Sequence, residues 1–210
     1  MLVASDIVSG ARILLNEMTE AFWLATDFIE WLKQAATDIS ARTYCYEVIE
    51  PVTLITSHAE YTLTTEFLKI HGANYIDTPI GLIRMTAWMG GTQEVPVSGP
   101  PKYFYDFAQI FGVSPTPVAA YNGKIVKVYC SATTSIITNI PNKFRTAAIL
   151  FVVTMGLIKE RQYAKAGSTL QIYSDLVALD IQSNFIPKVV PPALDTYILK
   201  AVSGAPANAT

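Results

Sequence analysis

Charge is scarce in this chain of 210 residues. Only 15% of the residues are Asp, Glu, Lys or Arg, whereas 51% are hydrophobic, and the mean hydropathy is +0.32. This composition indicates either a membrane protein or a chain whose surface is largely covered by other subunits. The best candidate for a membrane span, Thr146–Ile158, is shorter than the ~20 apolar residues that a transmembrane helix needs. The composition therefore favours buried contacts between subunits.

Residues that carry chemistry are also rare, with two cysteines and two histidines. Cys45 and Cys130 are isolated from each other and from histidine, so we expect two ordinary apolar thiols. His58 and His71, each placed in a turn or at a strand end, lack the spacing of a catalytic triad or a zinc site. Serine-hydrolase, phosphate-loop, zinc-protease and dinucleotide-binding motifs are absent as well. The sequence predicts no catalytic residue, no metal and no cofactor.

Basic residues do not cluster, and the 15 Lys and Arg are outnumbered by 17 Asp and Glu, giving a net charge of −2. This argues against tight sequence-independent binding of nucleic acid, although it permits passing contact with DNA. No basic region precedes an apolar stretch at the N-terminus, so we expect no signal peptide. Glu47 and Glu50 are interpreted as a solvated strand edge rather than an acid–base pair.

Helical periodicity opens the chain in two segments that are separated by about ten residues. Ser5 or Asp6 is expected to cap the first helix, and Thr26 the second, with Asp27 in the first turn. Trp23, in the break, is expected to close the end of the pair as a core side chain. The apolar faces comprise Ile7, Val8, Ala11, Leu14 and Leu15, then Phe28, Ile29, Leu32, Ala35, Ala36 and Ile39.

Helical periodicity returns after Asn142, which follows Pro141 and is a candidate cap. The helix after it is apolar on nearly all sides, so we expect it to be buried almost all round. A fourth helix is predicted from about Lys165 to Asn184. Its apolar stripe comprises Leu170, Tyr173, Leu176, Val177 and Ile181.

The middle of the chain changes to short segments rich in β-branched and aromatic residues, which predict strands. Asn122–Gly123 precedes one of them and is interpreted as a type I′ hairpin turn, in which both residues have positive φ. The predicted strands are Pro51–Ile55, Tyr61–Thr64, Phe67–Ile70, Ile80–Trp88, Tyr103–Phe107 and Ile125–Cys130.

These patterns predict an α+β protein. We expect an antiparallel helical bundle formed by residues 1–43 and 141–186, that is, by two N-terminal and two C-terminal helices. A β-rich insertion occupies residues 44–140, and residues 187–210 form an extended C-terminal arm. Three prolines at the start of this arm bar a helix, and such a segment has too few apolar residues to build a core alone.

Ten residues, in the order in which they occur, connect the chain to a known family. They are Leu14, Leu15, Asn16, Trp23, Trp31, Leu32, Ala35, Pro115, Pro117 and Tyr129. In this order they resemble bacteriophage head–tail adaptor proteins, also called head-completion or connector proteins. In that family two helices precede a β-rich excursion with a Pro-x-Pro segment and a strand bearing Tyr, and two long helices and an extended arm follow.

The resemblance implies a non-enzymatic ring, typically of twelve copies, that docks beneath the portal and extends the DNA channel towards the tail. The implied partners are other copies of the chain, the portal protein, a tail or nozzle protein and passing DNA, with no membrane. The protein would be made in the host cytoplasm and reside in the virion at the head–tail interface. Two other classes stay open: a tail or baseplate binding module, and an enzyme such as a hydrolase that uses His58.

The arm carries apolar residues beyond the last helix, which suit a groove or a sheet edge on a partner. We therefore expect it to be the docking arm for the portal. Its predicted partner-binding residues are Val189, Val190, Pro191, Leu194, Tyr197, Ile198 and Leu199.

Overall fold

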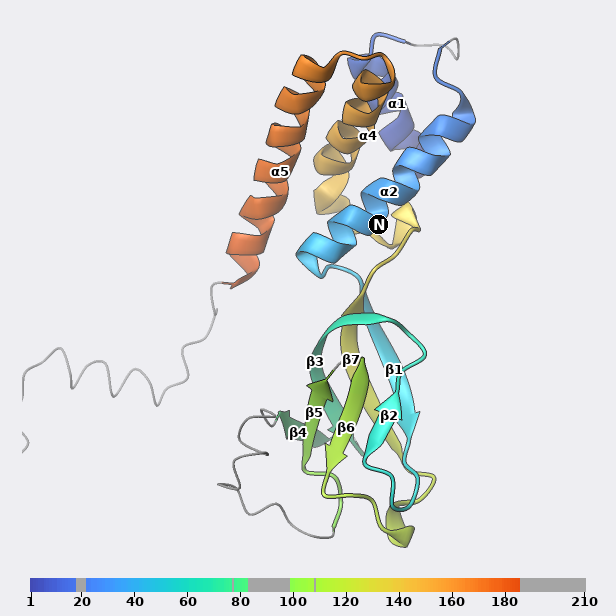
Figure 1. Cartoon of the computed structure of the whole chain (residues 1–210), viewed down its shortest axis with the longest axis vertical. Helices are drawn as coiled ribbons and strands as arrows, with labels where there is room; N and C mark the ends of the chain where they lie inside the picture. The colour runs from blue at the N-terminus through green and yellow to red at the C-terminus, as the bar shows by residue number, and fades with distance from the viewer. Residues whose placement is uncertain (18–21, 77, 83–98, 108, 186–210) are drawn as a thin grey trace, which may run out of the picture.

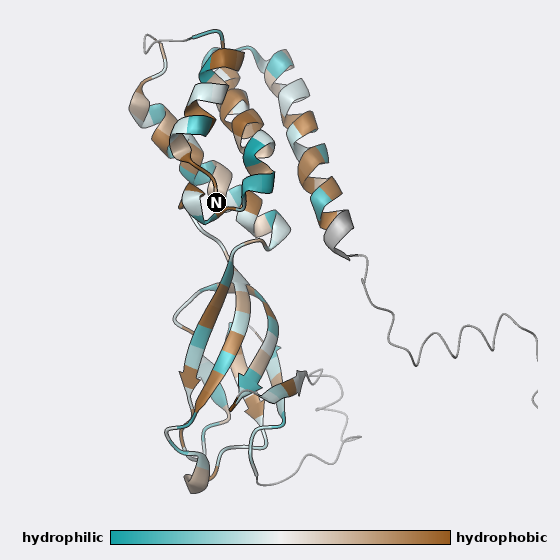
Figure 2. Ribbon diagram, turned by 180° about the vertical axis from the view of Figure 1, so that it is seen from behind, coloured by the Kyte–Doolittle hydropathy of each residue, from teal (hydrophilic) through white to brown (hydrophobic). Residues whose placement is uncertain are grey.

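The computed structural model describes residues 1–17, 22–76, 78–82, 99–107 and 109–185. Its described helices gather at one end of the molecule and its strands at the other (Figure 1). Both parts carry apolar residues along their length, as the hydropathy colouring shows from behind (Figure 2). The predicted α+β class is therefore confirmed.

Four α-helices make up the helical end: α1 (Ala4–Leu14), α2 (Ala25–Thr43), α4 (Arg145–Lys159) and α5 (Tyr163–Phe185). Helix α4 contacts each of the other three, so it is the centre of this part. The buried side chains between the helices include Ile7, Ala11, Phe28, Leu32, Ile39, Ala148, Val152, Tyr173 and Val177. The four predicted helical segments are thus confirmed.

The predicted helix caps are wrong, because both N-terminal helices begin earlier. Helix α1 follows Val3 and α2 follows Leu24, which leaves Ser5 and Thr26 inside the helices. For α2, the carboxylate of Asp27 in the first turn accepts a hydrogen bond from the Leu24 backbone N–H at 2.9 Å. This bond caps the helix from inside its first turn, so no capping side chain is needed at Thr26. Asp6, the other predicted cap of α1, also lies in its first turn.

The apolar faces of the two C-terminal helices are only partly buried. Leu150 and Leu157 of α4 are half-buried, which is less than the all-round burial that the sequence predicts. On α5, Tyr173 and Val177 are buried, whereas the predicted stripe residue Leu170 is exposed to 42%. The reason is that α5 packs mainly against α4 and α2, which buries a narrower face.

Seven strands form one mixed, nearly closed sheet in the order β1-β7-β3-β4-β5-β6-β2. The strands are β1 (Glu47–Thr53), β2 (Glu60–Thr62), β3 (Phe67–Tyr75), β4 (Thr78–Leu82), β5 (Tyr103–Phe107), β6 (Ile110–Ser114) and β7 (Ile125–Ala132). Neighbours are antiparallel except β4 and β5, which pair in parallel. Side chains from both ends of this order share one core, which includes Val52, Ile70, Phe104, Phe111, Val126 and Val128. The sheet therefore curls around its own core.

The predicted strands match the observed ones to different degrees. Strand β5 has the predicted bounds, whereas β6 was not predicted and β3 continues five residues beyond Ile70. Strand β1 begins four residues before Pro51, and its end position in the sheet explains how it accommodates a proline. For the predicted strand Ile80–Trp88, residues 83–98 lie outside the described residues.

The turn at Asn122–Gly123 is type II rather than type I′. Asn122 has φ −59° and ψ 134°, and only Gly123 has a positive φ, of 75°. The Lys124 backbone N–H donates to the Tyr121 carbonyl at 3.1 Å, which closes the turn. A 3₁₀ turn, Ala119–Tyr121, precedes it, and the Asn122 side chain accepts a hydrogen bond from the Thr56 N–H at 3.1 Å.

We expect Gly123→Val to destabilise the sheet by about 1 kcal/mol or more, because a β-branched residue resists positive φ. A side chain at this position would meet open space, so the loss would measure backbone strain alone. Urea unfolding followed by circular dichroism tests this, with Gly123→Asn as the control that tolerates positive φ. Equal stability of the two variants would contradict the assigned turn.

Glu50 ties the two end strands of the sheet together and is not the solvated residue that the sequence predicts. Its side chain on β1 is 8% exposed and accepts hydrogen bonds from the chain after β2. The donors are the Thr64 backbone N–H, the Thr64 hydroxyl at 2.8 Å and the Thr65 backbone N–H at 3.1 Å. Burial raises the pKa of Glu50, but these hydrogen bonds outweigh burial and hold that pKa below its usual value. Glu47, by contrast, is exposed as expected.

Glu50→Gln is expected to lower the free energy of unfolding by about 1–3 kcal/mol at pH 7. The neutral amide oxygen of glutamine is a weaker acceptor than the carboxylate for the three hydrogen bonds. A carboxylate with a lowered pKa stabilises the fold above the unfolded pKa of about 4.3. That stabilisation is lost as the pH falls through the lower folded pKa. The stability difference between wild type and variant should therefore shrink between pH 5 and strongly acidic pH. A difference that stays constant over this range would show that the charge of Glu50 contributes nothing.

Candidate docking surface

The described residues hold no group of three or more His, Cys, Asp or Glu side chains that could bind a metal ion. His58 lies in an exposed turn with Nδ1 3.4 Å from the Thr56 carbonyl. His71 lies within β3, not at a turn or strand end as predicted, and its Nε2 contacts the Ser131 hydroxyl. Ser131 is fully buried and donates that hydroxyl to the Tyr44 carbonyl at 2.9 Å. Its proton therefore points away from the histidine, unlike that of a nucleophilic serine.

The two cysteines are free thiols within apolar surroundings. Cys130 is fully buried and Cys45 is half-buried against the core of the helical end. Burial raises the pKa of both thiols, which disfavours the reactive thiolate. This environment agrees with the predicted role as apolar thiols. None of the helices that the structure describes has the length and apolar character to cross a bilayer.

Large apolar side chains are exposed at the end of the helical part that lies farthest from the sheet (Figure 1). They come from the end of α1, the chain before α2, the end of α4 and the start of α5. Their exposed fractions lie between 41% and 65%. We call this surface the helical apex; it comprises Ile13, Leu14, Phe22, Leu24, Ile158 and Tyr163.

Trp23 is the buried residue between two exposed side chains of the helical apex. It is 2% exposed and stands between two exposed neighbours, Phe22 at 53% and Leu24 at 54%. Gly156 of α4 makes room for Leu15 beside the ring, since a Cβ there would lie 2.8 Å from Leu15, whereas its distance of 3.5 Å from Trp23 Nε1 would be an ordinary contact. The prediction that Trp23 closes the end of the first helix pair as a core side chain is confirmed.

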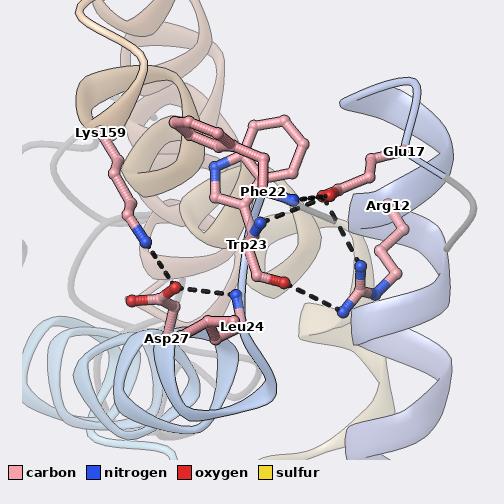
Figure 3. A network of polar contacts seen from close by, with 7 residues as sticks. All are labelled: Arg12, Glu17, Phe22, Trp23, Leu24, Asp27 and Lys159. Atoms are coloured by element: carbon pink, nitrogen blue, oxygen red, sulfur yellow. Dashed lines mark hydrogen bonds and ion pairs between the residues drawn. The ribbon is translucent and has the colours of Figure 1, made fainter. Parts of the chain in front are cut away.

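A polar network fixes the backbone on the α1 side of Trp23 (Figure 3). The Glu17 carboxylate accepts hydrogen bonds from the backbone N–H groups of Phe22 and Trp23, the latter at 3.4 Å. The Arg12 guanidinium donates to the Trp23 carbonyl at 3.3 Å and lies 3.6 Å from Glu17. The same guanidinium is stacked 4.6 Å from the centre of the Phe28 ring. One ion pair thus holds three backbone groups of an irregular segment.

A second ion pair fixes the α2 side (Figure 3). Asp27 accepts the Leu24 backbone N–H and pairs with Lys159 Nζ at 2.6 Å. The hydrogen bond from Lys159 lowers the pKa of Asp27 below its usual value, so the carboxylate stays ionised at neutral pH. Lys159 Nζ also lies 5.7 Å from the centre of the Phe22 ring. The end of α4 is thereby tied to the start of α2.

This arrangement suits the binding of a partner. The two ion pairs hold one large side chain inward and its two neighbours outward, so the apolar contacts are ordered before any partner arrives. Pre-ordering lowers the entropic cost of association, and exposed apolar patches are typical of interaction sites. Sequence reasoning missed Phe22 and Leu24, although apolar residues in a helix break, where polar turn residues are usual, are a signal.

The predicted partner-binding residues of the arm lie outside the described residues. They are Val189, Val190, Pro191, Leu194, Tyr197, Ile198 and Leu199.

A protein-family model described as "SU10 adaptor protein" matches residues 4–185. The match runs from the first residue of α1 to the last residue of α5, and it includes all described strands. It stops before the segment that holds the predicted arm residues. No curated protein matches the chain.

Proposed function

Because the chain belongs to the SU10 adaptor protein family, we propose that it is the head-to-tail adaptor of a tailed bacteriophage. Family membership makes it a structural adaptor protein of a phage and a component of the virion, which confirms the resemblance to phage adaptors. The finer proposal is a ring beneath the portal that extends the DNA channel and attaches the tail. The observation that carries it is the family match across all described helices and strands.

The surface of the molecule supports an assembled rather than a solitary state. Only 15% of the residues are charged, and large apolar side chains are exposed on helices and strands alike. The helical apex adds an ordered apolar face that would gain free energy when covered. We propose a ring of twelve copies, as the resemblance to head–tail adaptors implies, with portal and tail or nozzle proteins as partners. DNA would pass through with transient, non-specific contact.

The parts of the chain receive separate roles in this proposal. Residues 1–43 and 141–186 form the helical bundle of the ring, and residues 44–140 form the β-rich insertion. Residues 187–210 form the arm that binds the portal through its apolar side chains. The helical apex supplies a second, preformed contact within the head–tail joint.

Deleting the gene from the phage tests this function. The proposal expects DNA-filled heads and free, complete tails to accumulate, with few joined particles. Adding the purified protein to such an extract should restore joined, infectious particles. Joined but non-infectious particles, or tails that lack their distal end, would instead indicate a tail or baseplate module.

A further inference from the structure

Helix α5 presents an apolar ridge on its exposed side. Ile172, Leu176 and Leu179 are exposed to 53%, 36% and 61%, although each is a large aliphatic residue. Their spacing of four and three residues places them on one face and over a length of about 10 Å. The neighbouring residues Tyr173 and Val177 are buried against the helical core, so the ridge is not the face that stabilises this subunit. We call these three residues the α5 ridge.

Helices α1 and α2 form an apolar groove of about 320 Å³ between them. Its lining includes Ala4, Ser5, Val8, Ser9, Ala25 and Ile29. The serines and Ala25 are exposed and small, which leaves the groove open, while Ile29 is exposed to 54%. Along α1 the lining runs from Ala4 to Arg12, a length of about 12 Å. We call this site the α1–α2 groove.

The ridge of a subunit does not fill the groove of the same subunit. In Figure 1, α5 stands at one side of the helical end and α1 at the other; α4 contacts both, and α2 contacts α4 and α5. Ile172 and Leu179 of the ridge and Ile29 of the groove are each more than half exposed, so neither surface is covered within its own subunit. A second copy, placed beside the first, can cover them without any change of shape.

We infer that the α5 ridge of one copy packs into the α1–α2 groove of the next. This inference rests on the proposed adaptor ring and deepens it by naming the contact between neighbours. Apolar residues at i, i+4 and i+7 are the anchors with which a helix enters a groove, and the two lengths match. Because the two surfaces differ, the contact is head-to-tail, and repeated rotation closes it into a ring.

The size of the contact decides when it forms. Three aliphatic side chains are far fewer than the roughly 20–30 residues a side of a standard stable interface. Two free copies would therefore associate only weakly through this contact. Copies gathered on a common platform meet at high effective concentration, and a closed ring of weak contacts then becomes stable.

Cysteine crosslinking in intact virions tests the inference. One variant carries Ile172→Cys with Ser9→Cys, and a second carries Leu176→Cys with Ala25→Cys, each treated with a short bis-maleimide. Both should yield a ladder of dimers, trimers and larger oligomers on denaturing gels. Four control variants each carry only one of these added cysteines, together with the natural Cys45 and Cys130. They should yield no ladder. Absence of a ladder from both pairs would overturn the inference, as would dimers from Ile172→Cys alone, which would indicate ridge against ridge.

A charge placed on the ridge provides the second measurement. Ile172→Glu with Leu179→Glu should lower incorporation of the chain into virions at least tenfold, whereas Ala178→Glu, at another exposed position of α5, should not. Unchanged incorporation of the ridge variant would contradict the inference. If the unmodified chain is absent from virions, the proposed function fails instead. In that case the ridge–groove contact is tested separately by crosslinking concentrated purified protein. A ladder of oligomers would support the contact, and its absence would contradict it.

Discussion

Ending the chain after Pro187 is expected to leave a folded protein that no longer joins portal-bearing heads. The removed segment carries six large apolar residues, each worth ~1.5–3 kcal/mol on burial before ordering costs. A net loss of about 3 kcal/mol per arm lowers affinity roughly a hundredfold, and a ring multiplies the effect. An arm that docks on the portal adds nothing to the core of its own subunit, so the stability of the truncated chain should not change.

The arm could bind the portal or pack on its own subunit. Head binding and thermal unfolding, measured on the same preparation, distinguish these two roles. The matched control keeps the full length but replaces the six apolar residues with serine. They are Val189, Val190, Leu194, Tyr197, Ile198 and Leu199. Both variants should melt like wild type and fail to bind heads. Unfolding on truncation, or unimpaired head binding, would contradict the role of the arm as a docking element.

Trp23→Ala is expected to lower the free energy of unfolding by about 3–5 kcal/mol, because it removes a buried indole from the core. The side chain is 2% exposed and fills the space beside Gly156 and Leu15. Its loss would also release the backbone that carries Phe22 and Leu24, so docking should fail along with stability. Chemical unfolding of the purified protein measures the first effect.

Phe22→Ala is the matched control for this tryptophan. The adjacent ring is 53% exposed, so its removal should change stability by less than about 1 kcal/mol. If the helical apex is a docking face, this variant should nevertheless yield fewer joined particles. Equal destabilisation by both changes would show that Phe22 is a core residue and would remove the basis for the apex.

The helices could be predicted because each repeats an apolar residue at helical spacing over two or more turns. Their starts could not, since the bond that caps α2 comes from Asp27 inside the helix. Just before α1, the Leu2 N–H donates to the distant Ile140 carbonyl at 3.0 Å. Such long-range hydrogen bonds produce no local pattern in the sequence, so they cannot be predicted from it.

The sheet shows the same limit more strongly. Strand β5 is aromatic and was predicted at its observed bounds, whereas β6 is five residues long and contains Gly112, so it was missed. Closure of the sheet depends on Glu50, whose partners Thr64 and Thr65 are at least 14 residues away. A carboxylate beside a predicted strand is interpreted as solvated until its partners are known.

The candidate docking surface was the least predictable part. Trp23 stood out because tryptophan is rare and lay in an expected break. Its supporting ion pairs join Arg12 with Glu17 and Asp27 with Lys159, and the second spans most of the chain. Only the packing of α4 beside α2 brings those two charges together.

Electron cryo-microscopy of intact virions, with the map averaged around the tail axis, tests the adaptor function most directly. We expect a closed ring of this chain between the portal and the first tail protein, with the DNA channel running through its centre. In that ring, α5 of each copy should face α1 and α2 of its neighbour. A map that places the chain at the distal end of the tail, on the capsid shell, or outside the virion would contradict the adaptor function.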